Sequence, residues 1–262
     1  MAVIGYFLSI LIGISLGLIG GGGSILTVPL LVYFFSIDPL LAASYSLIIV
    51  GFTSLIGITP YVKDRNIDCK SVLSFGIPSI ITVFLTKYFL VPLIPVELTL
   101  TSSIHIKRDF ILLLFFSLIL LISAYSMIRK KNNEIQAPTF SSFKLIFQGS
   151  ITGFITGVIG IGGGFLIIPV LVKVCQIPMK KAVGTSLLII VLNALIGLLA
   201  VKDYSNFNIE LIISILFFAL LGMILGVRLS RKIAGDKLKV IFGWFVLVMG
   251  IVILGTELIK LI

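Results

Sequence analysis

The sequence predicts an all-α fold: a polytopic helical membrane protein composed of two internal repeats in inverted topology. The first observation is composition, because 59% of the 262 residues are hydrophobic and only 11% are charged, whereas soluble domains carry roughly 25% charged residues. The second is a series of long runs without Lys, Arg, Asp or Glu, most of them long enough for a transmembrane helix of about 20 residues. The third is a match of the chain to itself when it is shifted by 140 residues, which aligns Gly13 with Gly153; we call this shift the repeat offset.

The self-match pairs the segment 13–57 with the segment 153–197, and 18 of these 45 positions are identical without a gap. It extends through a loop and a following helix, which a shared apolar composition alone would not keep in register. Such a repeat indicates a duplicated structural unit. We therefore expect a first transmembrane repeat over residues 1–130, a cytoplasmic linker over 131–140 and a second transmembrane repeat over 141–262.

Residues 2–36 form the first apolar stretch of the chain. A single helix of this length would measure about 52 Å, but the hydrocarbon core of a bilayer is only about 30 Å thick. Two models follow: one broken crossing, or a re-entrant hairpin whose glycines form the bend and whose ends lie on one side. Each repeat is thus expected to contain a Gly-rich broken helix or re-entrant hairpin plus three spanning helices.

The later helices follow from further charge-free runs, and the boundary between the repeats follows from the polar, breaker-rich sequence RKKNNEIQAPT. The runs cover residues 71–86, 110–128, 145–172, 182–201, 211–227 and 240–256. After residue 71 the first repeat departs from the second, because Pro78, Lys87 and a polar insertion, VELTLTSSIHIKRD, interrupt its pattern.

The distribution of Lys and Arg selects between the two models. In the hairpin model each repeat has an odd number of crossings, so the second repeat is inserted upside down and 15 of the 20 Lys and Arg residues fall on one side. The broken-crossing model divides the same residues 11 to 9. Only the first division clearly obeys the rule that cytoplasmic loops are rich in positive charge. We therefore expect a multi-pass protein of the cell (inner) membrane, with the amino terminus outside and the 129–144 segment in the cytoplasm.

Glycine clusters occur in both repeats, as GLIGGGGS at 17–24 and GVIGIGGG at 157–164. Each precedes a proline-containing segment, which predicts a loop that opens onto a short helix. The first N–H groups of such a helix have no intrahelical partner and, with the helix dipole, form an anion site. The predicted substrate-binding residues at the two helix starts are Gly22, Gly23, Ser24, Ile25, Gly162, Gly163, Gly164 and Phe165.

The alternative for these glycines is close helix packing, which small residues allow in many membrane proteins. We favour packing for the separated pairs Gly13/Gly17 and Gly222/Gly226. Four consecutive glycines, however, weaken a helix more than a packing groove requires, and the clusters recur at the same place in both repeats. We therefore interpret the clusters as parts of a binding site.

Polar side chains in the following helices complete the predicted site. Thr53 and Asn193 occupy the same position of the repeat, and Ser186 lies two helical turns before Asn193. Such two-fold related groups suit a tetrahedral or pyramidal oxyanion, and the alternative is hydrogen bonding between helices or to an i−4 carbonyl. No ionisable residue lies near the middle of a predicted span, so we expect backbone dipoles to meet the charge of the anion.

The repeated motifs also carry a family resemblance. GLIGGGGSILTVPLLV is followed in the next predicted helix by AASYSLIIV, and GVIGIGGGFLIIPVLV is followed in the same way by AVGTSLLII. This pair resembles the signature of the sulfite exporter TauE/SafE family of membrane permeases. The resemblance implies secondary transport of sulfur-containing anions such as sulfite or organosulfonates, coupled to the proton gradient. The small anion and the lipid bilayer are then the expected partners.

Other classes of function find little support in the residues. No nucleophile–base pair or metal-ligand spacing appears, so we expect no enzyme activity, no catalytic residue, no metal and no cofactor. The basic residues lie in short loops between apolar runs, which favours membrane orientation over nucleic-acid binding. Cys69 and Cys175 have no neighbouring cysteine or histidine in the sequence, and we expect them to act as small hydrophobic residues. The alternative function is a passive anion channel, or a carrier of another small carboxylate or oxyanion, and the oligomeric state is left open.

Overall fold

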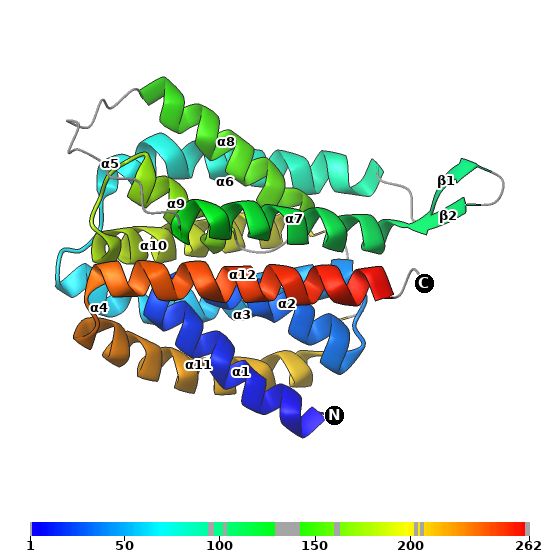
Figure 1. Ribbon diagram of the computed structural model, residues 1–262, viewed down its shortest axis with the longest axis horizontal. Helices are drawn as coiled ribbons and strands as arrows, with labels where there is room; N and C mark the ends of the chain where they lie inside the picture. Colours follow the sequence, from blue (N-terminus) through cyan, green and yellow to red (C-terminus); the bar gives the residue numbers. More distant parts are fainter. Residues whose placement is uncertain are drawn as a thin grey trace.

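The structure is a computed structural model of the chain. It describes residues 2–93, 97–101, 104–128, 142–159, 163–201, 204 and 207–259. Helices lie side by side along one direction, and the two ends of the chain lie at the same end of the molecule (Figure 1).

Both repeats consist mainly of helices. The first repeat holds α1 (Ala2–Ile19), α2 (Gly22–Phe35), α3 (Pro39–Gly57), α4 (Thr59–Lys63), α5 (Cys69–Ser71), α6 (Ile77–Leu85) and α7 (Arg108–Ile128). Two π-helical segments, η1 (Val72–Gly76) and η2 (Thr86–Leu90), flank α6, and the 3-10 turn η3 (Val91–Leu93) follows. The second repeat holds α8 (Ser142–Ile159), α9 (Gly164–Lys173), α10 (Met179–Leu199), α11 (Ile209–Lys232) and α12 (Gly235–Ile259).

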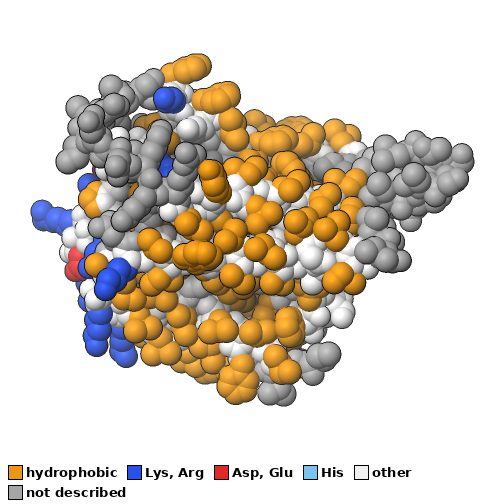
Figure 2. Space-filling model, viewed as in Figure 1, with side chains coloured by type: hydrophobic (Ala, Val, Ile, Leu, Met, Phe, Trp, Pro, Cys, Tyr) orange, Lys and Arg blue, Asp and Glu red, His pale blue; other side chains and the backbone are white. Residues whose placement is uncertain are grey.

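Five of the described helical stretches are long and apolar enough to cross a membrane. They are Pro39–Lys63, Cys69–Leu93, Met179–Leu199, Ile209–Lys232 and Val240–Ile259. Large hydrophobic side chains such as Phe7, Phe154 and Trp244 are exposed along the sides of the molecule, where Figure 2 shows a broad hydrophobic surface. A surface of this kind suits lipid, so the prediction of a polytopic helical membrane protein is confirmed.

The first Gly-rich stretch is a helical hairpin. The ring of Phe35, at the end of α2, lies 5.7 Å from the ring of Tyr6, near the start of α1. The chain thus returns to the end of the molecule from which it entered. This geometry is the re-entrant hairpin of the two models.

The second Gly-rich stretch returns in the same way. Gly149, near the start of α8, packs against the backbone of Phe75, and Cys175, just after α9, lies beside Ser71. Phe75 and Ser71 both belong to the first turns of the Cys69–Leu93 stretch. The outer ends of α8 and α9 therefore share one end of the molecule, the end of α4 and α5 (Figure 1).

Packing of the two hairpins repeats at the offset that relates the two halves of the sequence. A Cβ placed on Gly13 of α1 would lie 1.9 Å from the carbonyl oxygen of Ala219 in α11, and one on Gly153 of α8 would lie 2.3 Å from that of Ser79 in α6. One turn further along, the corresponding contacts are Gly17 with Met223 and Gly157 with Val83. Each hairpin therefore packs through glycines against a helix of the other half, while α3 packs on α10 and α7 on α12.

The polar insertion of the first repeat is a β-hairpin, which the all-α prediction did not include. Strand β1 (Glu97–Thr101) pairs antiparallel with β2 (Ile104–Lys107), and Glu97 lies opposite Lys107. The sequences ELTLT and IHIK alternate polar and apolar residues, which is the period of a strand. The hairpin projects from the end of the molecule opposite α4 and α5 (Figure 1).

Candidate functional site

The two glycine loops meet inside the molecule. A Cβ placed on Gly21 would lie 2.3 Å from the carbonyl oxygen of Gly164, and one on Gly164 would lie 2.6 Å from the Cα of Gly21. Only glycine allows two backbones to approach this closely. Because α2 begins at Gly22 and α9 at Gly164, the N-termini of two helices from different halves of the chain are brought together.

Two glycines in these loops require a left-handed backbone. Gly20 directly follows α1 with φ of +75°, and Gly163 precedes α9 with φ of +68°. Side-chain-bearing residues adopt this region at a steric cost, and glycine does not. At Gly163 space is also limited, since an added Cβ would lie 2.3 Å from Oγ1 of Thr156. These constraints fix the direction in which α9 leaves the loop.

The residues predicted on the first hairpin serve mainly its own packing. Gly23 lies against Leu16 of α1, and Ile25 is fully buried in the core. The hydroxyl of Ser24 donates to the carbonyl oxygen of Gly21 at 2.8 Å. Gly22 supplies the first residue of α2. The hydroxyl of Ser24 is therefore hydrogen-bonded to the backbone of the glycine loop.

The residues predicted on the second hairpin surround the start of α9. Gly163 is its N-cap and no side chain of the described structure caps it, while Gly164 and Phe165 are its first two residues. Gly162 and the side chain of Phe165 lie outside the described residues. The first N–H groups of a helix have no i−4 acceptor within it, although the N–H of Leu166 donates to the carbonyl oxygen of Gly163 at 2.9 Å.

The polar residues predicted on α3 and α10 differ in their contacts. Thr53 donates to the carbonyl oxygen of Ile49 in its own helix, which is the alternative considered for it. Ser186 donates to the carbonyl oxygen of Gly20 at 3.0 Å and so ties α10 to the first glycine loop. Asn193 belongs to the polar group described next.

The polar group consists of four side chains with buried polar atoms on α6, η2, α8 and α10, of which sequence reasoning found only Asn193. Nδ2 of Asn193 donates to Oγ of Ser79 at 3.4 Å. Among the described residues, Oδ1 of Asn193, Oγ1 of Thr156 and Nζ of Lys87 are buried and have no hydrogen-bond partner. Unpaired polar groups are costly inside a protein. Ligands commonly bind to such groups.

Lys87 was expected at the edge of a span, because the charge-free run ends at residue 86. The structure instead continues the helix through η2 to Leu93, so Lys87 lies inside the Cys69–Leu93 stretch. Its amine is enclosed by protein. Glu257 of α12 is also buried, and it accepts a hydrogen bond from the Tyr33 hydroxyl at 2.7 Å. Lys87 lies in the last third of its stretch and Glu257 near the end of its own, so they do not contradict the expectation of an uncharged middle.

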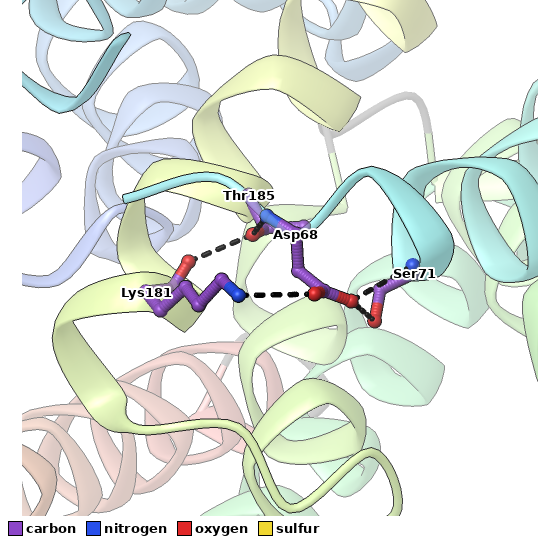
Figure 3. Close-up of polar contacts among 4 residues, drawn as sticks. All are labelled: Asp68, Ser71, Lys181 and Thr185. Carbon is purple, nitrogen blue, oxygen red and sulfur yellow. Dashed lines mark hydrogen bonds and ion pairs between the residues drawn. The ribbon is translucent and has the colours of Figure 1, made fainter. Parts of the chain in front are cut away.

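The opposite end of α10 carries a polar cluster around Asp68 (Figure 3). Oδ1 of Asp68 lies 3.2 Å from Nζ of Lys181, and Oδ2 accepts hydrogen bonds from the hydroxyl and N–H of Ser71 at 2.6 and 3.0 Å. Its own N–H donates to Oγ1 of Thr185 at 2.9 Å. Burial opposes ionisation of Asp68, but the bonds from Ser71 and the charge of Lys181 outweigh it and lower its pKa.

A small cavity opens beside this cluster. It has a volume of about 100 Å³ and is lined by Pro60, Tyr61, Asp64, Asn66, Lys180, Val183, Ser230, Arg231 and Leu238. Val183 also packs against Gly20 of the first glycine loop. Val183 thus contacts both a cavity with two cationic residues and the glycine loop in which the next residue, Gly21, meets Gly164. Figure 2 shows Lys and Arg side chains gathered at this end of the molecule.

Metal-ligating side chains do not gather in the part of the chain that the structure describes. No group of three His, Cys, Asp or Glu residues there could hold a metal ion. The candidate site is accordingly composed of helix N-termini, hydroxyl groups, one amide and one amine.

Helix N-termini that meet in the interior are found in polytopic membrane transporters and in channels, and comparisons with known proteins place this chain among the transporters. The model of the sulfite exporter TauE/SafE family matches residues 6–253. A probable membrane transporter protein of Methanocaldococcus jannaschii is 27% identical over 94% of both chains. YunE, a probable membrane transporter protein of Bacillus subtilis, is 29% identical over 93% of both chains.

The chain belongs to the sulfite exporter TauE/SafE family. It is therefore a multi-pass membrane transporter, and a small-molecule substrate and the lipid bilayer are its partners. No solved structure is significantly similar to the chain.

Proposed function

We propose that this protein is a secondary transporter, and specifically an exporter, of small sulfur-containing anions such as sulfite or organosulfonates. The observation that carries the proposal is the contact of Gly21 with Gly164, which joins the N-termini of α2 and α9. Two helix N-termini attract an anion through their N–H groups and dipoles. Broken helices that meet at the interface of two repeats form the substrate sites of many secondary transporters.

The proposed transporter has two inverted repeats that move relative to each other around the anion. Support comes from the packing of each hairpin on a helix of the other half with the same offset. We place the cationic end of the molecule in the cytoplasm of the cell (inner) membrane, following the positive-inside rule. An anion would then enter through the cavity at Lys180 and Arg231 and reach the glycine loops past Val183.

Transport measurements in liposomes test the substrate and the mode of transport. A carrier shows saturable uptake and exchange of labelled substrate, whereas a passive channel shows conductance. We expect saturable exchange of sulfite or an organosulfonate, because the glycine loops contact each other directly and close the path. Conductance without saturation would contradict a carrier, and exchange of acetate but of no sulfur anion would contradict the substrate class.

The role of the second glycine loop is tested at Gly163. Gly163→Val places a β-branched residue at φ of +68° and a Cβ 2.3 Å from Oγ1 of Thr156, so we expect transport to be lost. Gly255→Ala is the control, since nothing lies within 4 Å of its Cβ position. Both variants are checked for membrane insertion. Full transport by inserted Gly163→Val would return this glycine to a packing role.

A further inference from the structure

The two hairpins differ in the polarity of the helices around them. Positions related by the repeat offset make equivalent contacts, yet at three of them a polar residue on or beside the second hairpin stands where the related residue on or beside the first is apolar. The related pairs are Thr156 with Leu16, Ser79 with Ala219, and Lys87 with Val227. The first hairpin also has buried polar residues, Ser15 and Thr27, but their hydroxyls donate to carbonyl groups of their own helices, whereas Thr156 and Lys87 have no hydrogen-bond partner among the described residues. The difference indicates that the helices around the second hairpin have a role besides packing.

Lys87 is the most costly of these polar residues. It lies inside a stretch that is long and apolar enough to span a membrane, its amine is buried, and within the described chain no group accepts a hydrogen bond from it. A lysine near the end of a span ordinarily extends its amine to the membrane surface. An ionisable residue that is instead enclosed inside a membrane protein usually marks an ion or substrate pathway.

A series of contacts connects the backbone segment that carries Lys87 to the start of α9. Thr86, its neighbour in η2, packs against Gly157 of α8. The next residue of α8 toward its start, Thr156, points its hydroxyl at Gly163, the N-cap of α9. This hydroxyl is buried and has no acceptor among the described residues. The π-helical segment that carries Lys87 is itself a feature frequent at functional sites.

We propose that the anion is held chiefly on the side of the second hairpin, where the amine of Lys87 supplies a positive charge to the bound anion and Thr156 and the N–H groups at the start of α9 supply neutral donors. The proposal rests on the function proposed above and names the ligand class: a small oxyanion with several acceptor oxygens. The ammonium group offsets the charge of the anion, and the anion provides the hydrogen bonds that the amine lacks. The first hairpin then serves as the structural counterpart that holds α2 in contact with α9.

The first test needs no ligand. If the amine of Lys87 has no partner until an anion binds, it destabilises the protein without ligand. In thermal unfolding of purified protein, Lys87→Met should therefore unfold at the same temperature as the parent or at a higher one. Lys144→Met, at an exposed position of α8, is the matched control. A clear loss of thermal stability in Lys87→Met alone would show that the amine has a structural partner and would overturn the proposal.

The second test measures binding of sulfite to the same proteins, with chloride at equal ionic strength as the reference. We expect Lys87→Met to bind sulfite about tenfold to a hundredfold more weakly than the parent, because a hydrogen bond to a charged group is lost. Lys87→Arg, which keeps the charge, should lose less, and Lys144→Met should bind like the parent. Unchanged sulfite binding in Lys87→Met would overturn the role proposed for Lys87 but would leave the proposed transport function standing. A parent protein that binds no sulfite, organosulfonate or acetate would contradict the proposed function itself.

Discussion

At the scale of single residues, Asp68 shows how burial decides the value of an ion pair. Its carboxylate pairs with Lys181 at side-chain exposures of 16% and 36%, whereas Asp64 pairs with Arg231 at exposures of 49% and 56%. Exposed pairs contribute about 0 to 1 kcal/mol. Asp68 additionally accepts two hydrogen bonds from Ser71, and hydrogen bonds to a charged group contribute about 1.5 to 3 kcal/mol.

We therefore expect Asp68→Asn to lower the free energy of unfolding by about 1 to 3 kcal/mol near neutral pH, and Asp64→Asn to lower it by less than about 1 kcal/mol. Because folding lowers the pKa of Asp68 below its ordinary 3.8, the contribution is fully present above that value and is lost as pH falls through the folded pKa. Thermal unfolding from neutral pH to below the ordinary carboxyl range checks this. Equal effects of both substitutions would show that burial is not the deciding factor.

Several site residues could be predicted from the sequence and others could not, for physical reasons. The glycine clusters stand out because glycine is unfavourable in helices, and Asn193 because an amide is rare among apolar residues. The hydrogen-bond partner of a hydroxyl is harder to predict. Ser24 and Thr53 donate to carbonyl groups of their own chain segment, whereas Thr156 does not. Only the packing around each hydroxyl decides this. The repeat offset does carry a usable signal, since it pairs Thr156 with the apolar Leu16.

At the scale of helices, the contact of α1 with α11 depends on glycines of both. A Cβ on Gly222 would lie 2.0 Å from the carbonyl oxygen of Ile10, and one on Gly226 would lie 2.4 Å from that of Ile14. The interpretation of Gly13/Gly17 and Gly222/Gly226 as packing pairs is thus confirmed. In this contact the helices approach through their backbones, as small residues allow in membranes.

Adding one methyl group to this contact should separate the two helices. We expect Gly222→Ala to lower the free energy of unfolding by about 1 to 3 kcal/mol, the usual cost of overpacking. Gly255→Ala in α12, where nothing lies within 4 Å of the added Cβ, should be neutral or stabilising, because alanine favours a helix by up to about 1 kcal/mol over glycine. Thermal unfolding compares the two. A neutral Gly222→Ala variant would mean that the helices separate at no cost.

At the scale of the whole molecule, hydropathy predicted the long helices well. It did not predict the places where the regular α-helix is interrupted. The hairpin of α1 and α2 follows from length, since the apolar stretch 2–36 exceeds one crossing. The β-hairpin and the π-helical segments do not follow from hydropathy, because they depend on local pairing and packing. The division into repeats 1–130 and 141–262, joined by 131–140, and the inverted insertion stay predictions, as residues 129–141 lie outside the described structure.

Orientation in the membrane can be tested with the two native cysteines as a starting point. Cys69 is exposed at the cationic end of the molecule, whereas Cys175 is buried, and burial raises the pKa of its thiol. A raised pKa lowers the fraction of reactive thiolate. In a Cys175→Ala background, Cys69 should therefore react with an impermeant thiol reagent only from the cytoplasmic side, since positive charge is retained there.

The opposite end is reported by Ser103→Cys, introduced between β1 and β2 in a chain without other cysteines. The inverted arrangement requires an odd number of crossings between the amino terminus and the linker, and also between Ser103 and the linker, because α7 alone joins these two. Ser103→Cys should thus react only from outside, and Asn132→Cys, in the linker, only from the cytoplasm. Labelling of Ser103→Cys and Asn132→Cys from one side would exclude α7 as a crossing and with it the inverted repeats. Labelling from opposite sides, but with Cys69 outside, would keep the repeats and reverse the protein in the membrane.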